Sequence, residues 1–144
     1  LGKLHERSRD EFVATYRHVE MPAKNEWFIG AWFELANGSA AEAELTIKNL
    51  LAKRLATQPL NLPNAGSTFR NPEGDYAARL IEACGLKGHQ IGGAQVSEKH
   101  ANFIVTSPGA TAEDIDRTIT LMRDTVKEKF GIELQQEVRV IGEK

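Results

Sequence analysis

Apolar and polar residues alternate with different periods along the chain, and these periods predict a mixture of strands and helices. Residues 27–35 are apolar on both faces, which is typical of a buried strand. Residues 132–141 alternate between apolar and polar side chains, which predicts a half-buried strand with one polar face. Short strands are also expected around Gly92 and Gly93, and residues 102–105 are the best strand candidate in that region.

The first of three predicted helices follows Ser39, because Glu42 three residues later completes a capping-box pattern. Its residues Lys48, Lys53 and Arg54 are expected to face solvent. The opposite, buried stripe is expected to comprise Ala43, Ile47, Leu50 and Leu51.

Two further apolar patterns predict the second helix, which is short, and the third helix. Asp75 is expected to cap the second helix and Gly85 to end it. Thr111 and Asp114 begin the third helix, which Gly131 stops. The apolar residues expected to share one face are Tyr76, Leu80, Ile81 and Cys84 in the second helix, and Ile115, Ile119, Met122 and Val126 in the third.

The order of these elements favours an α+β fold. Strands and helices are mixed without a regular strand–helix–strand rhythm, so we expect one domain with a mixed, largely antiparallel sheet and helices packed on it. Residues 58–72 contain three prolines and are expected to form a loop. Residues 1–25 are polar and weakly patterned, and are expected to lead into a domain over residues 26–144.

Composition narrows the class of protein. A chain of 144 residues that is 41% hydrophobic and 26% charged fits one soluble globular domain. The net charge of −2 gives no electrostatic argument for binding nucleic acid or an anionic membrane. The longest apolar run is too short to span a bilayer, and charges interrupt residues 1–10 too often for a signal peptide. Cys84 is the only cysteine, so no internal disulfide is possible and a cytoplasmic setting is the simplest interpretation.

Glycine and short polar side chains are concentrated in residues 64–72, 85–88 and 91–102, which is typical of a ligand site built on loops. Ser67 lies in the first of these stretches, and by itself it is most simply a turn residue. A nucleophilic serine would need a histidine base, but no histidine is paired with Ser67 by its spacing and the nucleophile-elbow pattern is absent. A hydrolase is therefore weakly supported.

Other candidate residues are also ambiguous by themselves. Glu137 and Arg139 share one face of the last predicted strand, where a solvated charge pair is the ordinary explanation. His100 is most simply a hydrogen-bonded structural histidine, and no cluster of residues has the spacing of a metal site. The Gly92–Gly93 pair is expected to form a turn; a phosphate role is possible there, although dinucleotide-loop and P-loop patterns are lacking.

Taken together, these blocks resemble one family, the UDP-N-acetylenolpyruvoylglucosamine reductases. The resemblance extends from Tyr16 to Gly142 and includes the shorter connection after residue 35 that marks one class of the family. Its most specific blocks, in order along the chain, are residues 65–72, 85–88, 91–102 and 137–139. The family's N-terminal FAD-binding domain is absent from this sequence, so the resemblance covers the C-terminal, substrate-binding part.

The resemblance implies a function in peptidoglycan synthesis, and hence in cell-wall biogenesis, cell shape and cell division. NADPH reduces FAD, and the reduced flavin converts UDP-N-acetylglucosamine enolpyruvate to UDP-N-acetylmuramate. By this resemblance Arg17 binds the substrate carboxylate, Glu137 assists enolate formation and Ser67 donates a proton to the carbanion; arginine suits a carboxylate because its planar fork binds both oxygens. The residues expected to contact substrate are Tyr16, Gln58, Asn71 and His100.

Three positions depart from the family pattern. Gln136 stands where proline usually precedes the catalytic glutamate, Val19 stands where serine is common, and Arg70 stands where lysine is frequent. A non-catalytic nucleotide-sugar-binding domain is the alternative function, and an unrelated α+β interaction module is a third. Flavin content and UDP-sugar binding separate these three.

Overall fold

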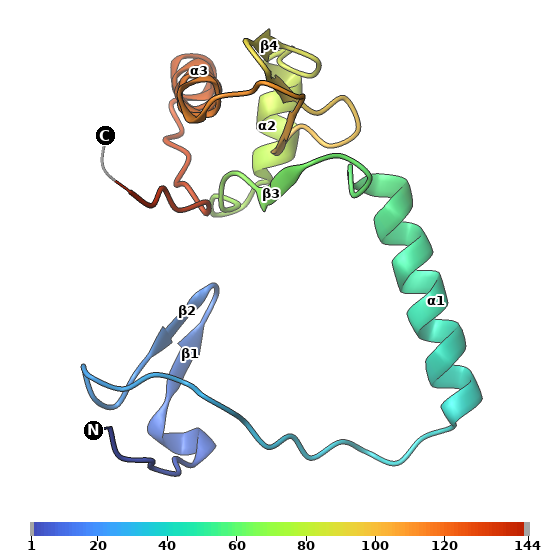
Figure 1. Cartoon of the computed structure of the whole chain (residues 1–144), viewed down its shortest axis with the longest axis vertical. Coiled ribbons are helices and arrows are strands. Elements are labelled where there is room, and N and C mark those ends of the chain that lie inside the picture. Colours follow the sequence, from blue (N-terminus) through green and yellow to red (C-terminus); the bar gives the residue numbers. More distant parts are fainter. Residues whose placement is uncertain (1, 143–144) are drawn as a thin grey trace. The chain divides into compact units, whose positions relative to one another are not determined.

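The computed structural model describes residues 2–142, and the chain divides into two compact units, Leu1–Gly38 and Ser39–Lys144. The described residues form three α-helices and two antiparallel sheets, so the predicted α+β class is confirmed (Figure 1). The boundary between the units follows residue 38, whereas the lead-in expected from the sequence ended at residue 25.

The first unit contains a β-hairpin that the sequence analysis did not predict. A short 3-10 helix, η1 (Arg9–Glu11), precedes strand β1 (Val13–Thr15), which pairs antiparallel with β2 (His18–Glu20). Thr15 is paired with His18, so the two residues between them form a tight turn. Every residue of both strands is exposed, which explains why no hydrophobic alternation marked them.

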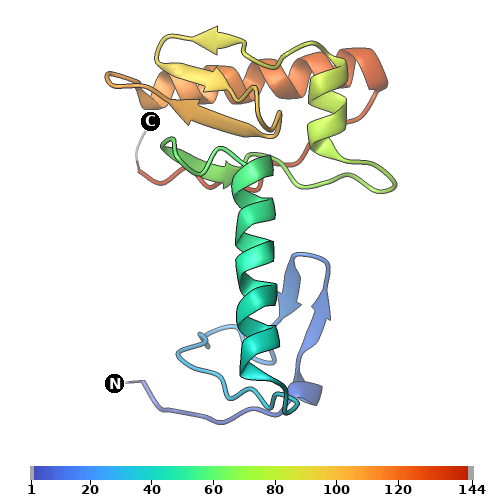
Figure 2. The same cartoon turned by 90° about the vertical axis from the view of Figure 1, so that its right-hand side faces the viewer.

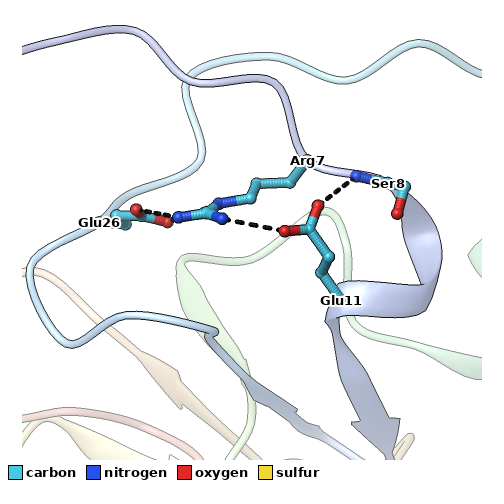
Figure 3. A network of polar contacts seen from close by, with 4 residues as sticks. All are labelled: Arg7, Ser8, Glu11 and Glu26. Carbon is cyan, nitrogen blue, oxygen red and sulfur yellow. Dashed lines mark hydrogen bonds and ion pairs between the residues drawn. The ribbon is translucent and has the colours of Figure 1, made fainter.

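Arg7 connects distant parts of the first unit (Figure 3). Its guanidinium forms ion pairs with Glu11 at 2.9 Å and with Glu26 at 2.5 Å. The other carboxylate oxygen of Glu11 accepts a hydrogen bond from the backbone N–H of Ser8 at 2.7 Å. These contacts attach η1 to the segment that follows the hairpin.

The strand predicted for residues 27–35 is not formed. This segment has no regular secondary structure, and Trp27, Trp32 and Phe33 are 78%, 98% and 82% exposed. A strand needs a neighbour with which to pair its backbone groups. Within residues 2–142 the two strands of the first unit pair only with each other, and none pairs with this segment.

Helix α1 (Ala40–Thr57) begins where predicted, but its burial is different. The Ser39 hydroxyl accepts a hydrogen bond from the Glu42 backbone N–H, as expected of an N-cap. The predicted buried stripe is wrong, because no residue of α1 is buried and Ile47, Leu50 and Leu51 are more than half exposed. An apolar stripe shows which face of a helix can be buried, but that face is buried only where another part of a structure packs against it. No described helix is long and apolar enough to cross a membrane.

The second unit is organised around a four-stranded antiparallel sheet with the order β3-β6-β5-β4. These strands are β3 (Asn64–Ser67), β4 (Gln90–Ile91), β5 (Ala94–Val96) and β6 (Phe103–Thr106). The strands expected around Gly92–Gly93 and at residues 102–105 are therefore confirmed. β3 corrects the prediction that all of residues 58–72 form a loop. Its register against β6 shifts between Asn64 and Ser67, around Gly66, whose φ is 82°, so the strand lacks the alternation that would reveal it.

Helix α3 (Ala112–Phe130) packs on β4 and β5, and α2 (Ala77–Ala83) packs on α3 (Figure 2). α3 begins at the predicted cap, Thr111, and ends at Gly131 in the left-handed conformation, as expected. α2 begins differently, because Tyr76 is its N-cap and is 67% exposed. The shared core comprises Phe69, Leu80, Ile81, Val96, Ile104, Ile119, Met122, Val126 and Leu134, among others.

The strand predicted for residues 132–141 is present only as a single bridge. Gln136 pairs antiparallel with Phe69, and the remaining residues from 132 to 142 have no strand assignment. The alternation predicted that Leu134 and Val140, on the same apolar face, would both be buried. Leu134 is buried in the core, but Val140 is 65% exposed. The partner segment after β3 runs beside this chain for only a few residues, so a full ladder does not form.

Candidate active site

Ser67 is the last residue of β3 and is partly buried. The turn before it is closed by Asn64, whose side-chain oxygen accepts a hydrogen bond from the Gly66 backbone N–H at 2.9 Å. The Asn64 amide nitrogen donates to the carbonyl oxygens of Pro59 and Leu62, at 3.1 and 2.8 Å. Hydrogen bonds from the Asn64 side chain therefore hold together the proline-rich segment that precedes Ser67.

Asn102 fixes the backbone immediately after Ser67. Its side-chain oxygen accepts from the Phe69 N–H at 3.0 Å, and its side-chain nitrogen donates to the Phe69 carbonyl at 2.8 Å. Its own carbonyl accepts from the Thr68 N–H at 2.8 Å. Asn102 is only 3% exposed, so these bonds are made away from water. The sequence analysis included Asn102 in a matched block but assigned it no role.

The C-terminal segment lies against the other edge of this loop. The Glu137 N–H donates to the Thr68 carbonyl at 2.9 Å, and the Arg70 N–H donates to the Gln135 carbonyl at 2.8 Å. With the Phe69–Gln136 bridge, these bonds align residues 135–137 with residues 68–70. The structure therefore brings the backbones of two predicted catalytic residues, Ser67 and Glu137, to neighbouring positions.

Asn71 and Gln58 have structural contacts in addition to the substrate contacts expected from the sequence. The Asn71 side-chain oxygen accepts from the Ala77 N–H at 3.1 Å, at the start of α2. Asp75, which was expected to cap this helix, instead accepts from the Tyr76 N–H and forms an ion pair with Arg79. The guanidinium lowers the pKa of Asp75 to about 2, since the pair favours the carboxylate. The prediction that Asp75 caps α2 is therefore wrong: the N-cap residue is Tyr76, and the Ala77 N–H bonds to Asn71 instead.

Gln58 is the C-cap of α1. Its side-chain oxygen accepts from Arg54 Nε at 3.1 Å, and its backbone N–H donates to the Arg54 carbonyl. The residue is partly exposed, and its contact with substrate stays a prediction.

His100 touches the Asn102 region directly. Its Nδ1 accepts from the Asn102 backbone N–H at 3.3 Å, and its ring lies edge-on to Phe103 with 4.8 Å between ring centres. Burial lowers the pKa of His100, because desolvation disfavours the imidazolium. A neutral imidazole is required for Nδ1 to accept a hydrogen bond, so the electrostatics and the geometry agree.

Tyr16 and Arg17 form the turn between β1 and β2 in the first unit. Arg17 has a φ of 58°, an uncommon left-handed conformation for a non-glycine residue, and its guanidinium carbon is 5.9 Å from the centre of the Tyr16 ring. Ser67, Asn71, His100 and Glu137 belong to the second unit. The segments of Ser67 and Glu137 are thus neighbours within the second unit. Arg17 lies in the hairpin of the first unit.

A carboxylate beside the Gly92–Gly93 turn disfavours a phosphate role for it. Asp114 Oδ2 accepts from the backbone N–H of Gly93 at 3.1 Å and from that of Thr111 at 3.0 Å. A side chain on Gly92 would overlap the Asp114 carboxylate. The Gly93 N–H is therefore already bound to a negative group, whose charge would also repel a phosphate. Across residues 2–142, no three His, Cys, Asp or Glu side chains gather as a metal site would require.

The sequence and the fold both match known proteins. Residues 58–141 match the family model described as UDP-N-acetylenolpyruvoylglucosamine reductase, C-terminal domain. The reductase of that name from Thiobacillus denitrificans is 57% identical over 144 residues, covering 99% of this chain and 44% of the relative. The Methylococcus capsulatus protein is 55% identical over 142 residues, covering 99% of this chain and 46% of the relative.

A solved structure agrees with these sequence matches. The crystal structure of UDP-N-acetylenolpyruvylglucosamine reductase from Thermus caldophilus aligns with a TM-score of 0.58 and 32% identity, covering 72% of this chain and 37% of that one. The chain spans less than half the length of the relatives named here. From the family model and these relatives, the chain belongs to the UDP-N-acetylenolpyruvoylglucosamine reductase family, of which it carries the C-terminal domain.

Proposed function

We propose that this chain is the substrate-binding and proton-donating part of a longer, FAD-dependent oxidoreductase. The complete enzyme would use NADPH to reduce UDP-N-acetylglucosamine enolpyruvate to UDP-N-acetylmuramate, a cytoplasmic step of peptidoglycan synthesis. Membership of the reductase family supports this assignment, and the rest of the longer polypeptide would supply the FAD-binding domain.

The observation that carries the proposal is the alignment of residues 135–137 with the loop after Ser67. Proton donation and charge stabilisation act on adjacent atoms of one substrate, so the groups that perform them must converge. The Glu137 N–H bonds to Thr68, the residue after Ser67, at 2.9 Å. Two residues assigned complementary roles thus lie on neighbouring segments joined by a backbone hydrogen bond.

Each side chain has a distinct role in the proposed chemistry. The reaction adds a hydride and then a proton across the enolpyruvyl double bond, so the carbon that does not receive the hydride carries the negative charge. The Ser67 hydroxyl donates its proton to that carbon, which is basic enough to accept one from a weak acid held in place. Arg17 binds the neighbouring carboxylate with its planar fork, and Glu137 assists formation of the enolate.

The residues that hold the cofactors would lie in the rest of the longer polypeptide. FAD, reduced by NADPH, would supply the hydride, but we assign no residue of this chain to hold it. The Gly92–Gly93 turn does not fit a flavin phosphate, since Asp114 fills it with negative charge. The contribution of this chain is therefore to bind and orient the UDP-sugar, through contacts from Tyr16, Gln58, Asn71 and His100, and to deliver the proton.

The assignment is tested with the full-length polypeptide. NADPH oxidation should depend on the enolpyruvyl sugar, and mass spectrometry should find a product heavier by two hydrogens. A colourless protein that binds the UDP-sugar without oxidising NADPH would instead support the nucleotide-sugar-binding alternative. Failure to bind the sugar at all would contradict both.

A further inference from the structure

The two residues that follow Ser67 are held by a residue with no assigned role. Asn102 contributes a side-chain acceptor to the Phe69 N–H, a side-chain donor to the Phe69 carbonyl and a backbone acceptor to the Thr68 N–H. A side-chain amide that bonds both the N–H and the C=O of one residue imitates a neighbouring strand. It therefore fixes the orientation of that residue more firmly than one hydrogen bond would.

This contact is placed where the sheet itself is irregular. β3 pairs with β6 at Asn64 and again at Ser67, but the register shifts between them, around Gly66. After Ser67 the ladder ends, and the backbone bonds that continue it run to Asn102 on one side and to residues 135–137 on the other. The sheet therefore pairs Ser67 itself with Phe103 but does not continue along Thr68 and Phe69, and Asn102 supplies the constraint on these two residues.

Asn102 is itself held firmly. It is 3% exposed and directly precedes β6, and its backbone N–H is bonded to His100 Nδ1. The two bonds between the Asn102 side chain and Phe69 measure 2.8 and 3.0 Å, so both have ordinary hydrogen-bond geometry. A buried amide with this many hydrogen bonds has little freedom to move, so it can hold the backbone to which it bonds in one place.

We infer that Asn102 is a positioning residue for proton transfer: it acts through Ser67 by fixing the Thr68–Phe69 backbone, so that the hydroxyl of Ser67 faces the carbon it protonates. This inference rests on the proposed function of Ser67. Without the clamp, the serine remains present but is displaced. A displacement of about 1 Å costs on the order of 10²-fold in the rate of a positioned step.

The decisive test is a double-mutant cycle in the full-length enzyme. Asn102→Ala should slow reoxidation of the reduced flavin by the enolpyruvyl sugar by roughly 10- to 100-fold. In a Ser67→Ala background the same substitution should have an effect of less than about 3-fold, because there is no longer a hydroxyl to position. Reduction of the flavin by NADPH should be unchanged in every variant. Equal slowing in both backgrounds, or no slowing in either, would overturn the inference.

Asn102→Asp provides a second variant if the alanine variant does not fold. Its carboxylate has the shape of the amide and still accepts from the Phe69 N–H, but when ionised it has no hydrogen to donate to the Phe69 carbonyl. Protonation restores that donor. The reoxidation rate of this variant, divided by that of the wild type at the same pH, should therefore rise as the pH falls. A ratio independent of pH, with both rates measurable, contradicts the clamp.

Ser97→Ala is the matched control. Ser97 is also 3% exposed, and its hydroxyl accepts from the backbone N–H of Lys99 and of His100, but within residues 2–142 it forms no hydrogen bond with the loop after Ser67. This variant should lower the melting temperature without energetic coupling to Ser67.

Amide hydrogen exchange separates failure of the clamp from failure of the proposed function. Exchange at Phe69 should accelerate in Asn102→Ala and not in Ser97→Ala, whether or not the protein reduces the sugar. Unchanged exchange at Phe69 would overturn the inference by itself.

Discussion

The backbone N–H of Glu137 donates a hydrogen bond to the carbonyl oxygen of Thr68, with 2.9 Å between nitrogen and oxygen. Thr68 follows Ser67 and is buried, while Glu137 is partly exposed. One backbone bond thus links the segment of the proposed proton donor to that of the proposed glutamate. Because the link is through the backbone, substitution of either side chain should leave the alignment of the two segments intact.

Glu137→Gln should remove most turnover of the full-length enzyme while changing KM by only a modest factor. The glutamine has nearly the same shape and keeps the backbone bond to Thr68, so the loss falls on the transition state. We expect kcat to fall by about 10²-fold or more, which is typical of a positioned acid–base group. Steady-state kinetics with the enolpyruvyl sugar measures this.

Glu133→Gln is the control for Glu137. Glu133 is on the same segment, and its carboxylate forms a surface ion pair with Lys127 at 2.8 Å. Surface pairs contribute little to stability, so kcat should stay close to that of the wild type. If Glu137→Gln behaves like this control, Glu137 is an ordinary solvated residue.

Stability should fall on acidification because of His100. Burial lowers the pKa of His100 from its ordinary value of 6.5; the charge on Lys87 acts in the same direction and that on Glu82 opposes it. The unfolded chain therefore takes up this proton before the folded chain does. The contribution of His100 is complete above pH 6.5 and is lost as the pH falls through the folded-state pKa.

His100→Asn isolates this effect, because the asparagine side chain can still accept from the Asn102 N–H but does not titrate. Between about pH 7.5 and about pH 5, the melting temperature of the wild-type full-length protein should fall further than that of His100→Asn. Parallel curves would show that His100 does not have a lowered pKa.

Gly92→Ala should destabilise the fold through two separable causes. The φ of Gly92 is +53°, which costs an alanine about 1 kcal/mol, and the added methyl group would also overlap the Asp114 carboxylate. Gly109→Ala is the matched control, since its φ is +88° but nothing lies near its side-chain position. Denaturant unfolding should therefore show a larger loss for Gly92→Ala than for Gly109→Ala. Equal losses would mean that Asp114 moves aside without cost.

The 144-residue chain alone should neither oxidise NADPH in the presence of the enolpyruvyl sugar nor retain FAD tightly. No residue of the chain is assigned to the flavin, and the relatives from Thiobacillus denitrificans and Methylococcus capsulatus are more than twice as long. Absorbance of the purified chain and a coupled NADPH assay measure both properties. Sugar-dependent NADPH oxidation by this chain would show that the flavin site had been overlooked.

Local signals predicted the elements that local interactions build. The cap at Thr111 and the left-handed Gly131 define α3, and residues 102–105 anticipated β6 within one residue. The start of α1 followed from Ser39 for the same reason. Each of these features depends on contacts within a few residues, which a sequence pattern records directly.

Features that depend on distant partners were not predictable from the pattern. The apolar stripe of α1 and residues 27–35 are exposed because no described segment covers them. Residues 132–141 alternate as a strand would, but they pair with another segment only at the bridge between Gln136 and Phe69. β3 was missed because its pairing to β6 is interrupted at Gly66. In the site, the family blocks identified Ser67 and Glu137. The hydrogen bonds from Asn102 to Phe69 join residues 33 positions apart, so the sequence pattern did not indicate them.

The role of Ser67 as proton donor is tested most directly by following the two half-reactions of Ser67→Ala separately, by stopped-flow flavin absorbance in the full-length enzyme. Reduction of the flavin by NADPH should be nearly unchanged, because that step does not use the serine. Reoxidation by the enolpyruvyl sugar should slow by at least about 10²–10⁴-fold, the usual loss when general acid catalysis is removed. Ser67→Cys should recover part of the rate, since a thiol can donate a proton from nearly the same place. A uniform slowing of both half-reactions would mean that Ser67 only maintains the loop, and an unchanged reoxidation rate would contradict the assignment of Ser67 as the proton donor.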